Sequence, residues 1–392
     1  MIKKSILLGL LTISTASFAN GITIKSDANL DANKSPVVFE INNQTGINFK
    51  TVAKDLEQTG QIETYFGSCD DVKNKIHRQV ACITTTGFSV NIAIPNATGL
   101  KKIESNIDSD SPLPVADAIY KAALNTEKSP FLTKIAYVSK SKRTGVYKLA
   151  VANYNGSNAR VLLTSPEPIL SPSWSNDGDY ITYTSYETVR GSIFIHDVRS
   201  NRRAKVFEKR GLNAYSTFGS NNHTLLLSAS GESKNSHIYR LNILNKQLAK
   251  TKNTNVNINA IYPRELPNGN FIFVTLGKND VPYLMERNKD GSSRYIKHYP
   301  LNAPSTDRNG DIVAINGSKL VKMNFKNGEW GQKNVIAIDN SIESPAISNN
   351  GLSVFYIFEK NGRNLIANSL ISGRKIITIS SSTENIIQVS AF

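Results

Sequence analysis

The sequence has few of the residues and motifs from which enzyme sites are usually built. Its 392 residues include only five histidines, and these stand apart from one another. It lacks the HExxH motif of zinc proteases, the GxSxG turn of α/β-hydrolases, the GxxxxGK[ST] phosphate loop and a GxGxxG loop after a strand. Asp177 and Asp179, or Asp108 and Asp110, lack the glycine and glutamate of a complete calcium loop and are interpreted as turn residues. We therefore assign no catalytic residue and expect no cofactor and no bound metal.

Cysteine is also scarce. Cys69 and Cys82 are the only two, and neither belongs to a CxxC motif or has a histidine nearby. In an oxidising compartment they could form a disulfide, which would stabilise the fold by about 3 kcal/mol through loop closure. The alternative is a pair of free, buried thiols.

Long apolar runs are confined to the start of the chain, so no transmembrane helix is expected later. Lys3 and Lys4 precede an apolar stretch over residues 6–13, and small residues lead up to Ala19. This order is typical of a secretory signal peptide cleaved after Ala19, whereas a buried N-terminal helix is the alternative. No cysteine follows the cleavage point, so we expect an exported protein with no lipid anchor and no membrane insertion.

Acidic residues are under-represented in one part of the chain only. Residues 20–128 carry 11 basic and 13 acidic side chains, whereas residues 129–392 carry 33 and 18. A positive field of this kind favours acidic partners. The basic residues are scattered without interleaved aromatic residues, so nucleic acid is not expected as a partner.

One segment recurs through the basic part of the chain. It reads SPSWSNDG at residue 171 and returns in altered form at residues 214, 260, 303 and 344. Each copy is a short strand-like run followed by a turn rich in Asn, Asp and Gly, which tolerate the positive φ of tight hairpins. Further strand-like runs follow each turn. Four strands per 40 to 45 residues is the pattern of a β-propeller blade.

A partial copy precedes the first full one. Residues 134–165 supply three strands, and the missing innermost strand is available in NIIQVSAF at the C-terminus. Val389 lies 44 residues after Pro345, in phase with the repeat. We therefore expect a six-bladed all-β propeller over residues 129–392, closed by the C-terminal strand and preceded by a linker at residues 125–131.

The first part of the mature chain, residues 20–128, has a different pattern. PVVFEI at residues 36–41 and VACITTTGFSVNIAI at residues 80–94 are typical of strands. Apolar residues recur at helical spacing over residues 49–56 and 115–122. These features predict a small α/β domain, so the whole fold is of a mixed class.

Polar residues stand just before four of the inner strands of the propeller. The pairs are Asn213-Ala214, Asn259-Ala260, Asn302-Ala303 and Glu343-Ser344. In a closed ring, these crossovers between blades gather on one face around the central channel. Either the asparagines merely support the crossover turns, or they form a polar collar that receives a loop or strand of a partner.

The order of signal peptide, small α/β domain and six-bladed propeller with SPSWSNDG-type repeats resembles the TolB family of the Tol-Pal system. The most specific stretch is ADAIYKAALNTEKSPFLTKIAYVSK, in which a helix runs into the first propeller strand. The chain departs from the family in a shorter middle of the α/β domain, in repeats such as AYSTFGSNN that lack Trp and Pro-Asp-Gly, and in the added cysteine pair.

The resemblance implies a non-enzymatic, monomeric protein of the periplasm that supports outer-membrane integrity and constriction at cell division. Members of this family bind the lipoprotein Pal through the propeller and TolA through the mature N-terminus. The residues expected here at the Pal-binding crossovers are Arg210, Gly211, Asn213, Ala214, Asn259, Asn302 and Glu343. A histidine that the family often carries in this loop aligns with Gly211.

The TolA-binding strand is expected at the start of the mature chain. Ile22 and Ile24 alternate with Thr23 and Lys25, so this segment could add to the edge of a partner's sheet. The resemblance also suggests that Pal at the propeller biases whether this strand is docked or released.

A periplasmic propeller enzyme or a carbohydrate-binding module is the alternative function. An enzyme would need catalytic groups converging in the channel, and none was found in the sequence. A sugar-binding module would need aromatic residues at the crossovers, where Tyr215 and Tyr262 are the candidates.

Overall fold

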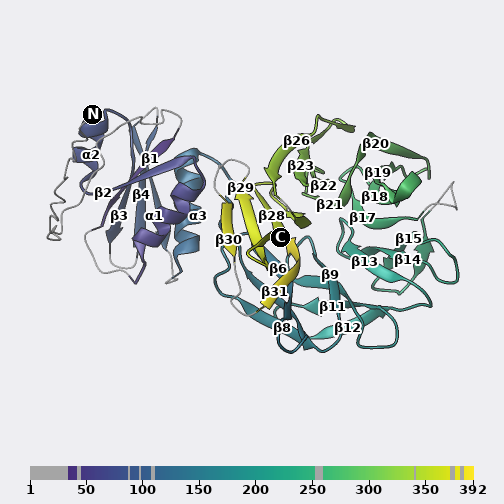
Figure 1. The fold of residues 1–392 in the computed structure, drawn as a ribbon. Coiled ribbons are helices and arrows are strands. Elements are labelled where there is room, and N and C mark those ends of the chain that lie inside the picture. The colour runs from purple at the N-terminus through teal and green to yellow at the C-terminus, as the bar shows by residue number, and fades with distance from the viewer. Residues whose placement is uncertain are drawn as a thin grey trace, which may run out of the picture. The chain divides into compact units, whose positions relative to one another are not determined.

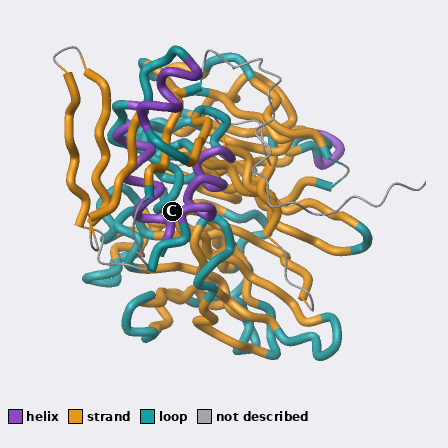
Figure 2. Tube along the Cα trace, turned by 90° about the vertical axis from the view of Figure 1, so that its left-hand side faces the viewer, coloured by secondary structure: helices purple, strands orange, loops and turns teal. Residues whose placement is uncertain are grey.

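The computed structural model shows a mixed fold with an α/β domain followed by a β-propeller (Figure 1). The residues that it describes are 34–41, 46–86, 89–96, 99–106, 111–251, 259–339, 341–370, 376–379 and 384–392. The expected signal peptide and the expected TolA-binding strand, Ile22 to Lys25, lie outside the described residues. Helices occur in the α/β domain, whereas the propeller is built from strands and loops with one short 3-10 turn, η1 (Lys278–Asp280) (Figure 2).

The α/β domain contains a five-stranded sheet in the order β2-β1-β3-β4-β5. Its strands are β1 (Ser35–Glu40), β2 (Ile62–Phe66), β3 (Ala81–Thr86), β4 (Ser89–Asn96) and β5 (Gly99–Asn106). The central β1 pairs in parallel with β2 and β3, and β3, β4 and β5 pair antiparallel. Both faces of β1 are covered, because its consecutive residues Val37, Val38 and Phe39 are all buried.

Two amphipathic helices supply most of the apolar side chains that pack on this sheet. They are α1 (Phe49–Gln58) and α3 (Pro112–Leu124). In α1 the predicted stripe of four apolar residues is buried as expected, and Asn48 caps the helix by accepting a hydrogen bond from the Thr51 amide at 3.2 Å. In α3 the stripe is also buried, except that Ala118 is only half-buried.

A third helix, α2 (Cys69–Ile76), was not predicted from the sequence. None of its residues is buried, so it has no apolar stripe that periodicity could reveal. Ser68 is its N-cap residue, and the Ser68 side chain accepts a hydrogen bond from the Asp71 amide at 3.4 Å. Local capping and the disulfide described next, rather than packing, hold this helix.

The two cysteines form a disulfide between the start of α2 and strand β3. The Cα atoms of Cys69 and Cys82 lie 5.9 Å apart, which is within the normal range for a disulfide. Glu40 accepts a hydrogen bond from the Cys69 amide at 2.8 Å, so β1 also anchors this end of the helix. Of the two alternatives left open by the sequence, the structure contains the disulfide.

In the described part of the chain, the propeller consists of six four-stranded antiparallel blades. From the inner to the outer strand, blade 1 is β31 (Glu384–Ala391), β6 (Lys134–Ser141), β7 (Tyr147–Asn153) and β8 (Arg160–Ser165). Blade 2 is β9 (Ile169–Trp174), β10 (Tyr180–Ser185), β11 (Ser192–Asp197) and β12 (Arg203–Phe207). Blade 3 is β13 (Asn213–Phe218), β14 (Thr224–Ala229), β15 (His237–Asn242) and β16 (Leu248–Lys250).

The remaining blades follow the same order. Blade 4 is β17 (Ile261–Glu265), β18 (Phe271–Leu276), β19 (Pro282–Arg287) and β20 (Ser293–Pro300). Blade 5 is β21 (Asn302–Thr306), β22 (Ile312–Asn316), β23 (Lys319–Met323) and β26 (Asn334–Ile338), with a hairpin of β24 (Phe325–Lys326) and β25 (Glu329–Trp330) inserted before β26. Blade 6 is β27 (Ile342–Ile347), β28 (Ser353–Lys360), β29 (Arg363–Leu370) and β30 (Ile376–Ile379).

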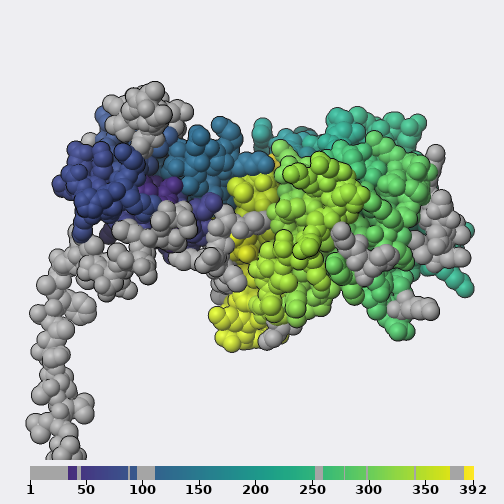
Figure 3. Space-filling view, turned by 90° about the horizontal axis from the view of Figure 1, so that it is seen from above, coloured from purple at the N-terminus to yellow at the C-terminus, as the bar shows by residue number. Residues whose placement is uncertain are grey.

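The C-terminal strand closes the ring, as the phase of the repeat predicted. β31 pairs antiparallel with β6, with Val389 opposite Tyr137, and the yellow C-terminal residues lie beside the start of the propeller (Figure 3). The Phe392 amide donates to the Lys134 carbonyl at 2.8 Å, and the Phe392 ring lies 5.9 Å from the ring of Trp174. The last residue therefore connects blade 1 to blade 2.

The apolar core of the propeller lies between the blades. Separate clusters join blades 1 and 2, blades 2 and 3, blades 3 and 4, blades 4 and 5, and blades 5 and 6. A blade cannot bury both faces alone, so each gains its stability from its neighbours. The linker is part of a further cluster, because the Phe131 ring packs against Tyr120 of α3 at 5.5 Å and against Tyr154 at 5.7 Å.

Candidate binding site in the propeller channel

Five of the six inner strands have a left-handed residue at the same position of the repeat. These residues are Ser171, Tyr215, Tyr262, Ala303 and Ser344, with φ between +46° and +55°. Each is next to a shift of strand register that marks a β-bulge. A non-glycine residue in this region costs on the order of 1 to 3 kcal/mol, and such strain tends to occur at functional sites.

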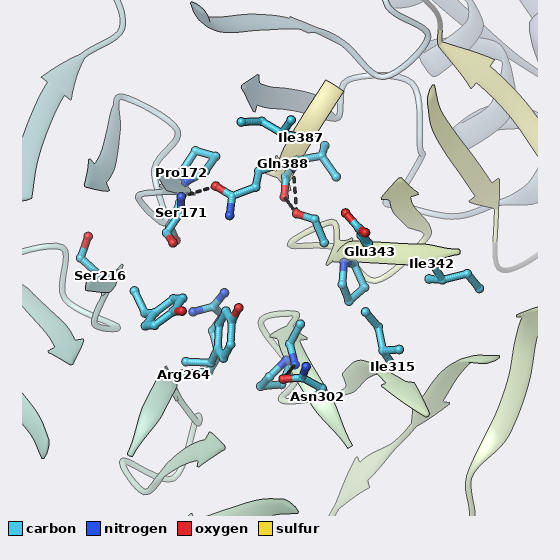
Figure 4. Close-up of a pocket in the computed structure, with 18 residues that line it drawn as sticks. Ser171, Pro172, Ser216, Arg264, Asn302, Ile315, Ile342, Glu343, Ile387 and Gln388 are labelled. Carbon is cyan, nitrogen blue, oxygen red and sulfur yellow. Dashed lines mark hydrogen bonds between the residues drawn. The ribbon is translucent and has the colours of Figure 1, made fainter. Parts of the chain in front are cut away.

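The five strained residues line one cavity at the mouth of the channel, with a volume of about 360 Å³ (Figure 4). The inner strands of all six blades contribute to its wall, including the closing strand through Ile387, Gln388 and Val389. The crossovers therefore gather around the channel, as the repeat predicted.

Arg264 of β17 is the principal charged group inside the channel. Its guanidinium donates to the Pro263 carbonyl at 2.8 Å. Burial lowers the pKa of Arg264 to about 10, so the side chain is still charged at neutral pH. Beside it, the rings of Tyr215 and Tyr262 pack at 4.1 Å between centroids, and burial raises the pKa of Tyr262, which stays neutral.

The closing strand is tied into the cavity wall by hydrogen bonds to both of its neighbours. Gln388 accepts from the Ser171 amide of blade 2 through its Oε1 atom (Figure 4). Ser344 of blade 6 accepts from the Val389 amide at 3.0 Å and donates to the Val389 carbonyl at 3.2 Å. The cavity wall is therefore complete only when the C-terminal strand closes the ring.

Two of the residues expected at the crossovers line this cavity. Glu343 is exposed at its rim, and Asn302 is half-buried with its Oδ1 atom accepting from the Ala303 amide at 2.8 Å. Asn259 does not line the cavity and accepts from the Ser236 amide at 2.9 Å. Arg210 is exposed and lies 3.7 Å from the carboxylate of Glu232.

Gly211 has a conformation that only glycine adopts easily. Its φ is +81°, and a Cβ atom at this position would lie 2.2 Å from the Ser230 hydroxyl and 2.5 Å from the Gly231 carbonyl. The histidine that the family often carries at this alignment position would not fit this crossover without moving its backbone.

The side chains of Asn213 and Ala214 do not reach the surface. Asn213 is buried and donates through Nδ2 to the carbonyls of Gly191 at 2.9 Å and Lys209 at 2.6 Å. It also accepts from the Lys209 amide at 3.2 Å. At this position the asparagine supports the crossover turn, which is the first of the two interpretations left open by the sequence.

A second cavity, of about 440 Å³, lies at the other ends of the inner strands. Arg264 lines both cavities, and the second also contains Glu265, Asp307 and Arg308. Glu265 forms an ion pair with Arg240 at 2.7 Å. Burial and the neighbouring Asp311 raise the pKa of Asp307 to about 6, and Arg308 donates to the Asn176 carbonyl of blade 2.

Sequence reasoning missed Arg264, although the repeats contained the signal. When the five inner strands are aligned on their left-handed residues, the position two residues later holds a small side chain in four of them. Those residues are Ser173, Thr217, Ser305 and Ala346. Only blade 4 places a long cationic side chain there, and it lines both cavities of the channel.

The described residues offer little support for a metal site. One group of three potential ligands was found among them, joining Glu40 to the two cysteines, and the sulfur atoms of those cysteines are bonded to each other. No helix within the described ranges is long and apolar enough to cross a membrane.

The fold and the channel define a six-bladed β-propeller protein with an N-terminal α/β domain and a polar site at the channel mouth. The family of the TolB β-propeller domain matches residues 121–390, so the chain belongs to this family.

Comparison with known proteins gives the same family. A Tol-Pal system protein TolB from Albidiferax ferrireducens is 41% identical over 100 residues, which are 26% of this chain and 23% of the relative. The TolB of Methylococcus capsulatus is 41% identical over 101 residues, or 25% of this chain and 24% of the relative. The alignments thus span about a quarter of these curated relatives.

The solved structures support the fold. The crystal structure of TolB from Acinetobacter baumannii superposes with a TM-score of 0.77 at 22% identity, covering 91% of this chain and 96% of that one. At this identity the similarity establishes a shared architecture over both domains.

Proposed function

We propose that this protein is a non-enzymatic, periplasmic scaffold of the Tol-Pal envelope complex, which binds Pal through the propeller and TolA through its mature N-terminus. Through these contacts it supports outer-membrane integrity and constriction at cell division. The relatives that match the chain are Tol-Pal system proteins, and this supports protein partners of that complex.

The observation that carries the proposal is the shape of the channel mouth. Five strained, non-glycine bulges from five blades converge on one polar cavity. A rigid wall of this kind loses little entropy when a peptide segment binds, because its polar groups are already in place. The propeller also contains the excess of basic residues, which favours an acidic partner.

Within this proposal the crossover residues divide into two roles. Arg210, Asn259, Asn302 and Glu343 present polar groups to Pal, whereas Gly211 allows the turn that precedes β13. Asn213 and Ala214 hold that crossover in place from inside the blade.

The carbohydrate-binding alternative is weaker, because the two aromatic residues at the crossovers face each other. The rings of Tyr215 and Tyr262 lie 4.1 Å apart and are tilted by 44°. A sugar ring would have to separate them before it could stack on either face.

Binding of purified Pal to the mature protein, measured by calorimetry, tests the propeller assignment. Replacing both Asn302 and Glu343 by alanine should weaken Pal binding at least tenfold, because both side chains lie at the cavity. Replacing Asn245 and Glu127, which are exposed and line no part of this cavity, is the matched control. Equal affinity of both double variants for Pal would refute the assignment of this face.

The N-terminal assignment is tested separately. Deletion of residues 20–30 should abolish capture of TolA in a pull-down and leave the affinity for Pal in the calorimeter unchanged. TolA retained by the shortened protein would show that another surface binds it.

A further inference from the structure

Arg264 has an environment that is unusual for a charge inside a protein. Its guanidinium lies where the two cavities of the channel meet, and the hydrogen bond found for it goes to the carbonyl of its neighbour Pro263. Among the described residues, no carboxylate forms an ion pair with it. An arginine has five N–H donors in a planar fork that matches a carboxylate, so the described residues leave most of the donor capacity of Arg264 unused.

Two of the three acidic side chains around the channel, Glu265 and Asp307, already have other interactions. Glu265 pairs with Arg240 at 2.7 Å and accepts from the Ser220 amide at 2.6 Å. Asp307 accepts from the Asn309 and Asp311 amides, both at 2.9 Å. Glu343 is exposed at the rim of the first cavity.

Two amides increase the donor character of the first cavity. The Oε1 atom of Gln388 is used by the Ser171 amide, and the Nε2 atom is directed toward the open space (Figure 4). The Oδ1 atom of Asn302 is likewise used by the Ala303 amide, which leaves its Nδ2 group as a donor. The cavity therefore offers N–H groups from three blades around one fixed cation.

We propose that the channel is a carboxylate-binding site, in which Arg264 pairs with an acidic side chain of a peptide segment inserted by the bound partner. This inference rests on the proposed function, because it specifies what the Pal-binding face recognises. Arg264 lies among tyrosine rings and small side chains, so a carboxylate that enters exchanges water for a two-pronged, charge-assisted hydrogen bond. The site selects for acidic segments, and glutamine or asparagine in the same segment binds more weakly.

A double-mutant cycle between this protein and Pal tests the pairing. Arg264→Gln removes the charge and keeps much of the length, and each Asp or Glu of Pal is changed in turn to Asn or Gln. Loss of a hydrogen bond to a charged group should weaken binding about 10- to 100-fold. At one acidic position of Pal, the substitution should weaken binding to the wild-type protein but should not weaken binding to Arg264→Gln any further.

Two further variants separate pairing from general effects. Arg264→Lys keeps the charge without the planar fork, and it should bind with intermediate affinity. Arg199→Gln makes the same change of net charge at an exposed turn of blade 2, and it should bind Pal as the wild type does. The urea midpoint of every variant, followed by fluorescence of the two buried tryptophans, shows whether it is folded.

The outcomes distinguish the inference from the proposed function. If Pal binds wild type and folded Arg264→Gln equally, or if no acidic position of Pal couples to Arg264, the carboxylate site is refuted while Pal binding stands. If Pal does not bind the wild type, the proposed function fails, and saturation-transfer NMR with N-acetylglutamate amide and N-acetylglutamine amide then decides the inference. Saturation of the glutamate compound alone, lost in Arg264→Gln, supports the site, and equal signals for both compounds overturn it.

Discussion

Replacing Asn213 by alanine removes a buried side chain that joins the crossover into blade 3 to the backbone at Gly191. The amide donates to the carbonyls of Gly191 and Lys209 at 2.9 and 2.6 Å, with a longer contact to Gly211 at 3.4 Å. Its oxygen accepts from the Lys209 amide at 3.2 Å. Each such bond contributes about 1 kcal/mol net, and a buried group left without a partner costs about 1 to 3 kcal/mol.

We therefore expect Asn213→Ala to lower the free energy of unfolding of the propeller by about 2 to 4 kcal/mol, or its melting temperature by roughly 5 to 15 °C. Trp174 and Trp330 are the only tryptophans, and both are buried in the propeller. Tryptophan fluorescence during urea unfolding thus follows this domain alone. Asn213→Asp has the same shape but cannot donate to either carbonyl, so it should be at least as unstable.

Asn302→Ala is the matched control, because that side chain is half-buried and accepts one local hydrogen bond at 2.8 Å. It should change the free energy of unfolding by less than about 1 kcal/mol and should weaken Pal binding instead. The reasoning would be refuted by an Asn213→Ala variant that unfolds at the wild-type midpoint. It would also be refuted if that variant were fully stable but lost its affinity for Pal, since Asn213 would then act as a surface contact.

Three further perturbations follow from the contacts described above. Gly178→Ala should lower the free energy of unfolding of the propeller, measured in urea, by about 1 to 3 kcal/mol, because φ is +78° and the new Cβ would lie 2.7 Å from the ring of Phe392. If a second change, Phe392→Ala, does not relieve part of this cost, the steric explanation fails. Burial lowers the pKa of His196 below 6.5, so the neutral histidine contributes stability above pH 6.5, and this stability is lost as the pH falls through the lower pKa of the folded state. His196→Gln should therefore flatten the decline of the melting temperature between pH 7.5 and 5. An unchanged decline would show that other groups cause it. Cys69→Ser should destabilise the α/β domain by about 3 kcal/mol while leaving the tryptophan-detected unfolding of the propeller unchanged, and a shift of that transition would show that the two domains unfold together.

The architecture of the propeller could be predicted because its information is local and repeated. Each blade has its own hairpin turns and alternating strands, and the spacing of the copies fixes how many blades there are. The phase of Val389 relative to Pro345 even indicated that the last strand belongs to the first blade, and β31 pairs with β6 as expected. The helix α2 escaped prediction because a surface helix without buried residues leaves no periodic signal.

The site could be predicted only in part. Asn302 and Glu343 were expected at the channel mouth and line its cavity, because the repeat fixes where each crossover occurs. The orientation of Asn213 could not be read in the same way. Counted from the left-handed residue of each inner strand, Asn213 stands two residues before Tyr215, whereas Asn302 stands only one residue before Ala303. The residues equivalent to Asn213 in blades 5 and 6 are Leu301 and Ile342, which are also buried.

The sequence by itself determined the number of blades, the closing strand and the basic character of the propeller, since each depends on residue type and spacing along the chain. Only the tertiary structure decided which side chains meet in the channel, because its wall is assembled from six strands that are far apart in sequence. The exposed Glu343, the buried Asn213 and the charge of Arg264, which has no ion pair among the described residues, are consequences of that assembly, in which strand bulges and neighbouring blades fix the direction of each side chain.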